Sequence, residues 1–449
     1  MNLPALRRLM LALLAGVALI AAGCGDDDDD GGSTGAATSG AATQEAEPSD
    51  VSGTVSMVGI WTGDEQESFQ AVLDGFNERY PDVTVNYNPA GDNTPTVLST
   101  AVEGGNPPDL ATIAQPGLIR QFAEQGALQP LTFAKEEIEA NFPQDIVDLG
   151  TIDGELYSFV FKAANKSTVW FNVQAFEDAG VEAPATWEDL TSAAETIKAS
   201  GLPAYSIAGA DGWTLTDLFE NIYLRQAGPE KYDQLTNHEI PWTDQSVKDA
   251  LTTMADVIGD SDNIVGGTSG ALETDFPTSV TNVLSESPKG AMVIEGDFVP
   301  GVVTTDLEPG TDYDVFAFPS INGSGPTVVG GGDSVVMFKD SPAGQALVEY
   351  LASPEAAEIW ASRGGFSSAN TQLSPDAYSD DLTRTTATAI AEAETFRFDM
   401  SDLAPAAFGG TPGQGEWKIL QDFLADPTKV DQTAQKLERS AARAYRDQE

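Results

Sequence analysis

Short segments rich in carboxylates, amides and aromatic rings recur along the chain, mostly just after predicted strands. The residues in them that could contact a ligand are Trp61, Asp64, Glu65, Asp92, Gln115, Asn165, Lys166, Trp213, Asp297, Phe298, Gly332, Asp333 and Arg363. Carboxylate, amide and guanidinium groups match the donors and acceptors of hydroxyl groups, and flat rings can pack on the apolar C–H faces of a pyranose. This combination predicts a carbohydrate-binding site.

Each of these residues also has a purely structural interpretation. Trp61 and Trp213 could be core aromatics, since tryptophan is mostly buried on average. Asp64 and Asp92 could cap helices or form turns, which aspartate favours. Gly332 could simply shape a turn. The binding hypothesis therefore depends on the joint placement of these residues after strands.

Motifs of the common catalytic and cofactor sites are missing from residues 51–449. There is no Gly-Lys-Ser/Thr phosphate loop, no Gly-x-Gly-x-x-Gly and no Gly-x-Ser-x-Gly elbow. The single histidine, His238, is predicted to lie in a surface loop. Because transition-metal sites usually need several His or Cys residues, we expect no metal, no cofactor and no catalytic residues. A carboxyl pair of the glycoside hydrolase type stays open among the 70 Asp and Glu residues.

The elements that position these segments alternate between strands and helices. Predicted strands around Val51–Val58, Val83–Tyr87 and Asp109–Ala114 alternate with predicted helices around Phe69–Tyr80 and Val97–Val102. Such alternation predicts parallel βαβ units with helices on both faces of the sheet. Open parallel sheets bind ligands beyond the carboxyl ends of their strands, which is where the polar and aromatic segments lie.

The later part of the chain carries more helices and a few strands. Helices are predicted at Leu118–Ala123, Trp187–Lys198, Leu215–Arg225, Val247–Ile258, in two pieces broken at Pro354 between Ala343 and Arg363, and from Trp417 onward, and strands at Ala291–Ile294, Val315–Pro319 and Ser334–Phe338.

Composition limits the classes of function. The net charge of −48 would repel the phosphates of nucleic acid, so we expect no nucleic-acid partner. A chain with one cysteine has no internal disulfide, so the 41% of hydrophobic residues must stabilise the fold by packing.

The first residues predict export and lipidation. Arg7 and Arg8 precede an apolar run, Leu9–Ile20, and the small residues Ala21–Gly23 lead to Cys24. A basic region, an apolar region and a small-residue cleavage site form a signal peptide, here residues 1–23. The site resembles a bacterial lipobox, which would place a lipid on Cys24 and the protein on the outer face of the cell membrane. An ordinary signal peptide with a chance cysteine is the alternative.

Residues 24–50 are predicted to be a disordered acidic and Gly/Ser tether. The run Asp26-x-Asp28-x-Asp30-Gly31 resembles the start of a calcium-binding EF-hand loop, but Ala37 stands at the twelfth position, where such a loop needs a carboxylate.

Several longer stretches resemble the bacterial extracellular solute-binding proteins of sugar ABC transporters, family 1, which includes the maltose-binding protein. They are Gly105–Leu110, Leu128–Leu131, Pro184–Leu190, Ala291–Met292 and Tyr350–Ala356. Further runs resemble the α-glucoside-binding branch: Phe161–Trp170, Asp297–Val302, Arg363–Ser367 and Phe396–Leu403. Trp417 is the nearest match to a pocket aromatic near the C-terminus of many relatives. Where many relatives have Gly-Pro-Trp, this chain has Gly296-Asp297-Phe298.

The resemblance implies an α/β, two-lobed periplasmic-binding-protein type II fold with hinge crossovers. Lobe 1 would comprise residues 51–162 and 320–368, and lobe 2 residues 163–319 and 369–449. It also implies a monomeric, non-enzymatic lipoprotein that binds an α-glucoside or similar oligosaccharide between the lobes and delivers it to ABC permease subunits, contacting the membrane only through its lipid. A surface glycoside hydrolase and a sugar receptor for a sensor kinase are the alternative functions.

Overall fold

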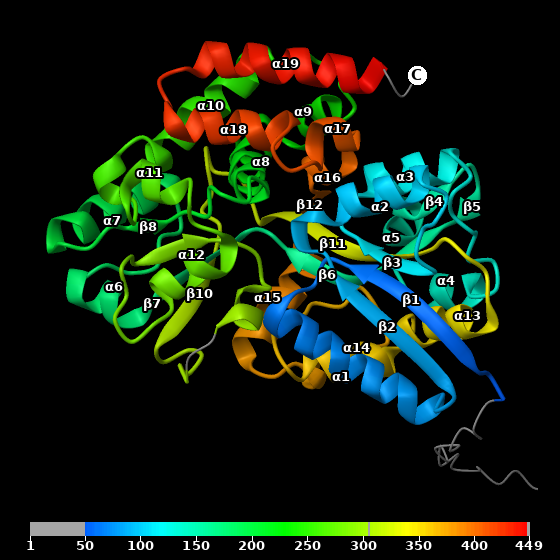
Figure 1. The fold of residues 1–449 in the computed structure, drawn as a ribbon. Helices are drawn as coiled ribbons and strands as arrows, with labels where there is room; N and C mark the ends of the chain where they lie inside the picture. Colours follow the sequence, from blue (N-terminus) through cyan, green and yellow to red (C-terminus); the bar gives the residue numbers. More distant parts are fainter. Residues whose placement is uncertain (1–49, 304–305, 447–449) are drawn as a thin grey trace, which may run out of the picture. The chain divides into compact units, whose positions relative to one another are not determined.

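The computed structural model describes residues 50–303 and 306–446, and two main β-sheets organise this part of the chain (Figure 1). The predicted signal peptide, Cys24 and the predicted tether up to residue 49 lie outside the described residues. Among the helices of the described ranges, none combines the length and the apolar character needed to cross a membrane.

The first sheet has six strands, in the order β12-β11-β3-β1-β2, with β6 also paired to β11. Its strands are β1 (Gly53–Gly59), β2 (Val83–Pro89), β3 (Leu110–Ile113), β6 (Ser158–Asn165), β11 (Thr327–Met337) and β12 (Thr395–Phe398). The strands β2 and β3 both run parallel to β1, as the alternating pattern predicted. The long strand β11 is antiparallel to β3 and β6, so the sheet is mixed.

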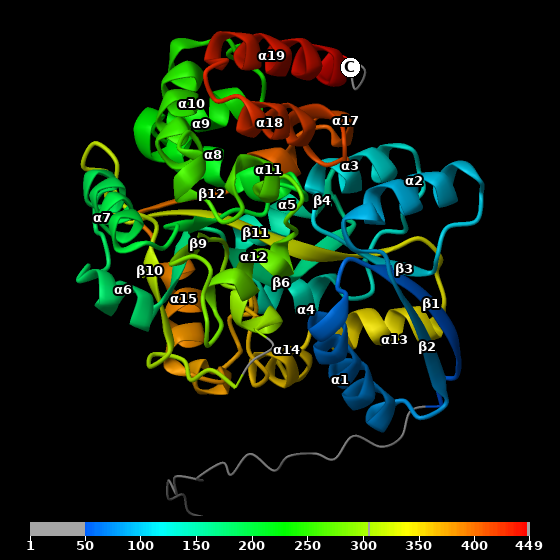
Figure 2. The same cartoon turned by 60° about the vertical axis from the view of Figure 1, so that its left-hand side comes forward.

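Helices cover both faces of the first sheet. Val55 and Met57 of β1 pack into one core with α1 (Gly63–Arg79), α13 (Pro342–Leu351) and α14 (Pro354–Ala361). The neighbouring Val58 faces the other core, with α2 (Thr94–Glu103) and α3 (Pro116–Glu124). This follows from the two-residue period of a strand. Figures 1 and 2 both show α1 and α14 below the sheet and α2 and α3 above it.

The helices begin where the sequence supplies capping residues. The predicted break at Pro354 is confirmed: Ser353 caps α14 by accepting a hydrogen bond from the Ala356 amide, and Pro354 occupies the first turn. Proline at this position lacks only an amide hydrogen that would have no partner in the helix.

Two of the polar segments, which were expected to follow strands, lie inside strands instead. Gly331, Gly332 and Asp333 belong to β11, and Lys162 and Asn165 belong to β6. The prediction failed because β6 is buried along its whole length and β11 along most of its length, so neither shows the alternating polarity of a half-exposed strand. Packing requires glycine at position 332, since a Cβ there would lie 2.8 Å from the carbonyl oxygen of Lys162.

The second sheet has four strands, in the order β10-β7-β9-β8. They are β10 (Tyr313–Ala317), β7 (Thr168–Asn172), β9 (Met292–Ile294) and β8 (Tyr205–Ser206). Val169 and Phe171 pack against α7 (Trp187–Ser200), α8 (Trp213–Ala227) and α10 (Gln245–Ile258). Trp170, between them, packs on the opposite face with α12 (Phe276–Val283). Only Lys166 and Ser167 separate β6 of the first sheet from β7 of the second.

The C-terminal helices α18 (Gly415–Ala425) and α19 (Val430–Arg446) pack beside α8 and α10 (Figures 1 and 2). The apolar face of α19, with Ala434, Leu437 and Ala441, recurs at helical spacing and is buried.

The remaining elements are mostly short, apart from α15. They are η1 (Gly91–Asn93), α4 (Lys135–Asn141), α5 (Gln144–Leu149), β4 (Thr151–Ile152), β5 (Glu155–Leu156), α6 (Val173–Ala179), α9 (Pro229–Thr236), η2 (Ser261–Asn263), α11 (Gly267–Ala271), η3 (Val299–Val302), η4 (Pro375–Ala377), α15 (Asp381–Glu392), α16 (Met400–Leu403) and α17 (Ala406–Gly409).

Candidate functional site

A cavity of about 450 Å³ is lined by strands of the first sheet and by helices that pack against each of the two sheets. This volume lies within the range of about 300–1,000 Å³ that is typical of small-molecule sites. Most of the residues that were predicted to contact a ligand line it: Trp61, Asp64, Glu65, Asp92, Gln115, Lys166, Trp213, Phe298, Gly332, Asp333 and Trp417. The structure thus brings residues as far apart in the sequence as Trp61 and Trp417 to one cavity.

Three residues predicted to bind a ligand are not part of this lining. Asn165 is buried; its side chain accepts a hydrogen bond from the Ser167 amide and donates one to the carbonyl of Thr386. Asp297 accepts a hydrogen bond from Ser367 Oγ at 2.5 Å. Arg363 donates from Nε to Ser68 Oγ at 3.2 Å. In this structure the three side chains hold segments together around the cavity.

Trp61 shows the structural role that was its alternative interpretation, while still reaching the cavity. Its side chain is only 1% exposed, and its ring lies 4.6 Å from Phe69 and 4.9 Å from Trp360, measured between centroids. Its indole N–H donates to Asp333 at 2.6 Å. A buried Trp N–H usually needs such a partner, so Trp61 orients the Asp333 carboxylate at the cavity wall.

Lys162 provides a buried positive charge beside Asp333. Its ammonium forms an ion pair with Glu65 of α1 and lies 5.3 Å from the ring centroid of Trp360. Burial alone would lower the pKa of Lys162, but the carboxylates of Glu65 and Asp333 outweigh it and raise the pKa. Lys162 therefore stays charged, and it joins α1 to β6 across the cavity wall.

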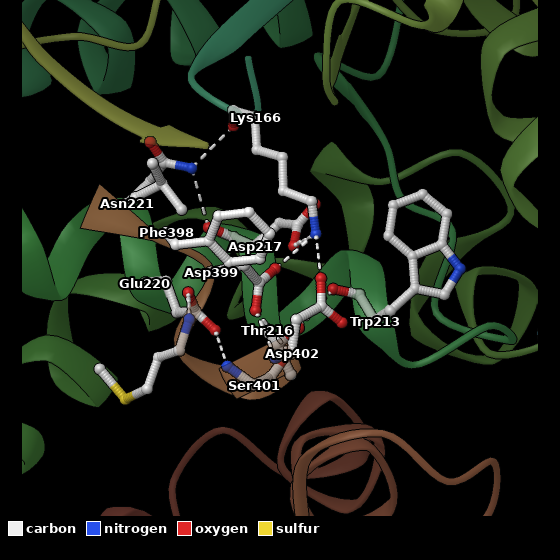
Figure 3. Close-up of polar contacts among 12 residues, drawn as sticks. Lys166, Trp213, Thr216, Asp217, Glu220, Asn221, Phe398, Asp399, Ser401 and Asp402 are labelled. Atoms are coloured by element: carbon white, nitrogen blue, oxygen red, sulfur yellow. Dashed lines mark hydrogen bonds and ion pairs between the residues drawn. The ribbon is translucent and has the colours of Figure 1, made fainter. Parts of the chain in front are cut away.

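Lys166 lies at the centre of a buried ionic cluster (Figure 3). Its ammonium is 3.1 Å from Asp217 of α8 and 3.4 Å from Asp402 of α16, and it also pairs with Asp399. Burial alone would lower the pKa of Lys166, but Asp217 and Asp399 outweigh it and raise the pKa well above its ordinary value. The cluster joins the segment between the two sheets to α8 and α16.

The carboxyl groups of this cluster differ in protonation. Burial alone would raise the pKa of Asp399, but Lys166 and hydrogen bonds lower it to about 2. Burial and the nearby Asp399 raise the pKa of Asp402 to about 7. The pKa of Asp217 is raised well above its ordinary value, mainly by burial. At neutral pH the cluster therefore contains ionised Lys166 and Asp399, a protonated Asp217, and an Asp402 that is about half ionised.

Glu220 fixes the position of α16 behind the cluster. Its carboxyl group accepts hydrogen bonds from the Tyr232 hydroxyl at 2.6 Å and from the amides of Met400 and Ser401 at 2.6 and 2.9 Å. These amides belong to the first turn of the helix, where backbone donors have no partner in the helix itself. Glu220 thereby presents Asp402, on the same turn, to Lys166 and the cavity.

Among residues 50–303 and 306–446, no group of three or more Asp, Glu, His and Cys side chains is arranged to hold a metal ion. The Lys166 ammonium occupies the position between the three aspartates of its cluster.

Two carboxylates and three rings form a further part of the cavity wall, which we call the aromatic box: Asp92, Asp211, Trp213, Phe276 and Phe298. The ring centroids of Trp213 lie 5.5 Å from Phe276 and 5.9 Å from Phe298, and the two phenylalanines are 5.3 Å apart. Trp213 and Phe298 are only partly buried, so both rings remain accessible from the cavity.

The two acids of the aromatic box are difficult to ionise. Burial and the neighbouring Asp211 raise the pKa of Asp92 to about 7. Burial raises the pKa of Asp211 to about 6, although its carboxylate accepts a hydrogen bond from the Phe276 amide at 2.5 Å. Burial therefore outweighs the hydrogen bonds that these two acids accept, from Trp213 in the case of Asp92 and from the Phe276 amide in the case of Asp211.

Several lining residues were absent from the sequence prediction: Lys162, Asp211, Asp275, Phe276 and Asp402. Asp275-Phe276-Pro277 has the pattern of a helix start, with an acidic N-cap and proline in the first turn, and a helix start can place side chains at a ligand. Lys162 and Asp402 lie in the runs Phe161–Trp170 and Phe396–Leu403, which carried the family resemblance. Asp211 had no comparable signal.

Two glycines make a close contact at the edge of the cavity. Gly365 has a φ of +63°, and a Cβ there would lie 2.5 Å from both the Cα and the amide nitrogen of Gly301 in η3. The helix η3 also contacts α1. Only glycine at position 365 allows the two backbones to approach this closely.

Residues 62–358 match a family described as bacterial extracellular solute-binding protein. The osmoprotective compounds-binding protein GgtB of Synechocystis sp. is 34% identical over 392 residues, which cover 85% of this chain and 91% of that protein. The alpha-glucosides-binding periplasmic protein AglE of Rhizobium meliloti is 32% identical over 396 residues, 85% of each chain.

Solved structures with the same fold are more distant in sequence. The solute receptor AcbH, described as having an exclusive preference for β-D-galactopyranose, aligns with a TM-score of 0.76 at 20% identity and covers 87% of this chain and 99% of its own. A chitin oligosaccharide binding protein also aligns with a TM-score of 0.76, at 19% identity, over 88% of this chain and 99% of its own. The chain has the two-lobed α/β fold of these proteins.

Proposed function

Since the chain belongs to the bacterial extracellular solute-binding proteins, the substrate-binding components of ABC importers, we propose that it captures an α-glucoside or a similar oligosaccharide and delivers it to a permease. Membership in this family places the protein outside the cytoplasm, in a family of binding proteins and not of enzymes. The observation that carries the proposal is the cavity in which carboxylates, ammonium groups and partly exposed rings meet.

The chemistry of the cavity supports a saccharide. Trp213 and Phe298 offer flat faces to the C–H groups of a pyranose. Asp92, Asp333 and Gln115 offer acceptors and donors for hydroxyl groups. Trp417 adds a further ring to the lining of the cavity.

The linkage preference is supported by one of the relatives. AglE is described as binding alpha-glucosides, and its alignment with this chain covers 85% of each protein. GgtB, described as binding osmoprotective compounds, favours a second candidate: a small, highly hydroxylated compatible solute. Both ligand classes present hydroxyl groups, and the same cavity would bind them.

Binding is proposed to draw two lobes together, residues 51–162 with 320–368 and residues 163–319 with 369–449. A ligand that contacts both lobes favours the closed arrangement. Support comes from the lining, which combines Asp64 and Asp92 of the first lobe with Trp213 and Phe276 of the second. The Gly301–Gly365 contact joins the same two parts.

The chain is further proposed to be a monomeric lipoprotein, cut before Cys24 and tethered to the outer face of the membrane by residues 24–50. The composition of residues 1–24 supports this part of the proposal. A tether would keep the binding protein at a high local concentration beside its permease.

Isothermal titration calorimetry tests the ligand class. Maltose, trehalose and sucrose are titrated into the purified protein, with cellobiose as the matched β-linked isomer of maltose. We expect saturable binding of at least one α-glucoside, much weaker binding of cellobiose, and a rise in melting temperature with ligand concentration. Failure of every saccharide to bind would contradict the proposal, and sustained release of glucose would favour the hydrolase alternative.

A further inference from the structure

The cavity contains more carboxylates than its ammonium groups compensate. Its lining has two lysines, Lys162 and Lys166, and the carboxylates Asp64, Glu65, Asp92, Asp211, Asp275, Asp333 and Asp402. Both lysines are already engaged, Lys162 with Glu65 and Lys166 with Asp217, Asp399 and Asp402. The cavity therefore has a net negative charge that its own side chains do not neutralise.

Part of this excess charge lies at the aromatic box. The charged groups that raise the pKa of Asp92 are Asp211 and Glu65. The charged group that raises the pKa of Asp211 is Asp275. All of them are negative. Neighbouring carboxylates repel one another, and a cation placed among them would relieve that repulsion.

The rings of the box favour the same kind of ligand. A cation over an aromatic face is attracted by the negative centre of the ring. The chain's own ammonium groups already approach two of these rings: Lys162 lies 5.6 Å from the centroid of Phe298, and Lys166 lies 5.9 Å from that of Trp213. The third ring, Phe276, closes the box beside them.

We propose that the cavity prefers amine-bearing saccharides and that the aromatic box holds the ammonium group of the ligand. Asp92 is the specificity-determining residue of the box. This inference rests on the proposed function. A neutral hydroxyl can donate hydrogen bonds to these carboxylates but leaves their charge uncompensated. An ammonium group supplies both the donors and the charge, and hydrogen bonds between charged groups are the stronger kind. An anionic sugar would add to the repulsion.

Matched ligands test this preference. The probes are maltose and α,α-trehalose, their amino-deoxy derivatives with the amine at each ring position in turn, and the N-acetyl form of each amine as its neutral counterpart. Titrations are made at pH 7.5 in 0.15 M NaCl, where the attraction between distant charges is largely screened. At least one amine is expected to bind about tenfold more tightly than both its parent sugar and its acetylated form.

Two variants locate the effect. Asp92→Asn removes one charge from the box without changing the size of the side chain, and it should reduce the amine-to-parent affinity ratio to about one. Glu67→Gln removes the same charge from an exposed position of α1, and it should leave that ratio unchanged. Equal ratios in Asp92→Asn and the unmodified protein would mean that the overall negative charge, and not the box, attracts the amine.

The outcome separates this inference from the proposed function. If neutral α-glucosides bind and no amine binds more tightly than its parent, the inference is wrong and the proposed function stands. If no saccharide binds, charged or neutral, both fail.

Discussion

Two parts of the cavity wall use the same kinds of side chain and differ in charge balance. At the lysine end, Lys162 and Lys166 are buried among carboxylates that pair with them. At the aromatic box, Asp92 and Asp211 face one another with rings beside them, and the pKa of each acid is raised. The lysine end therefore pairs its charges within the chain, while a ligand is proposed to supply the cation at the box. In that case the lysine end stabilises the fold and the box selects the ligand.

The largest expected effect comes from removing the charge at the lysine end. Lys166→Met leaves Asp399 and its neighbours buried without their ammonium partner, and the free energy of unfolding should fall by about 3–5 kcal/mol. Urea denaturation measures it. The control is Lys339→Met, since the Lys339–Asp109 pair is 3.6 Å long and the lysine side chain is 46% exposed. That variant should change stability by less than about 1 kcal/mol. Equal losses in both variants would refute the structural role of the cluster.

A substitution in the box should affect affinity more than stability. Trp213→Ala removes a partly exposed ring, and sugar affinity should fall by about 30- to 100-fold, as when an aromatic anchor of an interface is truncated. The control, Trp187→Ala, empties a buried core position and should lower stability by about 3–5 kcal/mol while the folded fraction keeps its affinity. Calorimetry and thermal melting measure both quantities. Similar losses of affinity and stability in Trp213→Ala would show that its ring belongs to the core.

The raised pKa values predict that stability falls as pH rises from about 4 to 7. Asp92 and Asp402 have folded pKa values of about 7, and Asp211 and Asp297 of about 6, all above the ordinary 3.8. Between these limits the folded state holds protons that the unfolded chain has lost. Each such proton lowers the free energy of unfolding by about 1.4 kcal/mol per pH unit.

Urea denaturation at pH 5, 6 and 7 measures this slope. Asp92→Asn should reduce it by the contribution of one proton, which assigns that share to the box. The slope should persist in 1 M NaCl, since salt screens exposed charges more than buried ones. A flat profile at high salt would mean that only the self-repulsion of the net charge of −48 was being measured.

Periodicity in the sequence predicted the elements that bury one face and expose the other. Val83–Tyr87 was confirmed as part of β2 and Trp187–Lys198 as part of α7, because each buries one face and exposes the other. The first part of β11 was missed because Gly331 and Gly332 give no apolar signal, although the missing Cβ leaves room for the Lys166 side chain at Gly331 and for the β6 backbone at Gly332. Local pattern cannot show a contact that forms only after distant segments meet.

The residues of the candidate site were predictable only in part, because local pattern places residues after strands but does not show which of them the fold encloses. Acidic and aromatic residues after strands led to Asp92 and Trp213, which both line the cavity. Trp61 follows β1 in the same way, yet its ring is enclosed by Phe69 and Trp360, which only the fold reveals. His238, predicted to lie in a surface loop, is in a turn, where its ring stacks on Tyr445 of α19.

The contact between Gly301 and Gly365 has a consequence for the timing of transport. It joins two stretches of main chain with no side chain between them, so making or breaking it requires no rotamer to be ordered or released. In the proposed closing motion, this edge of the cavity would add little to the barrier for reopening. The dwell time of a captured sugar would then depend on its own contacts in the cavity, and a permease that pulls the lobes apart would meet little resistance at this edge.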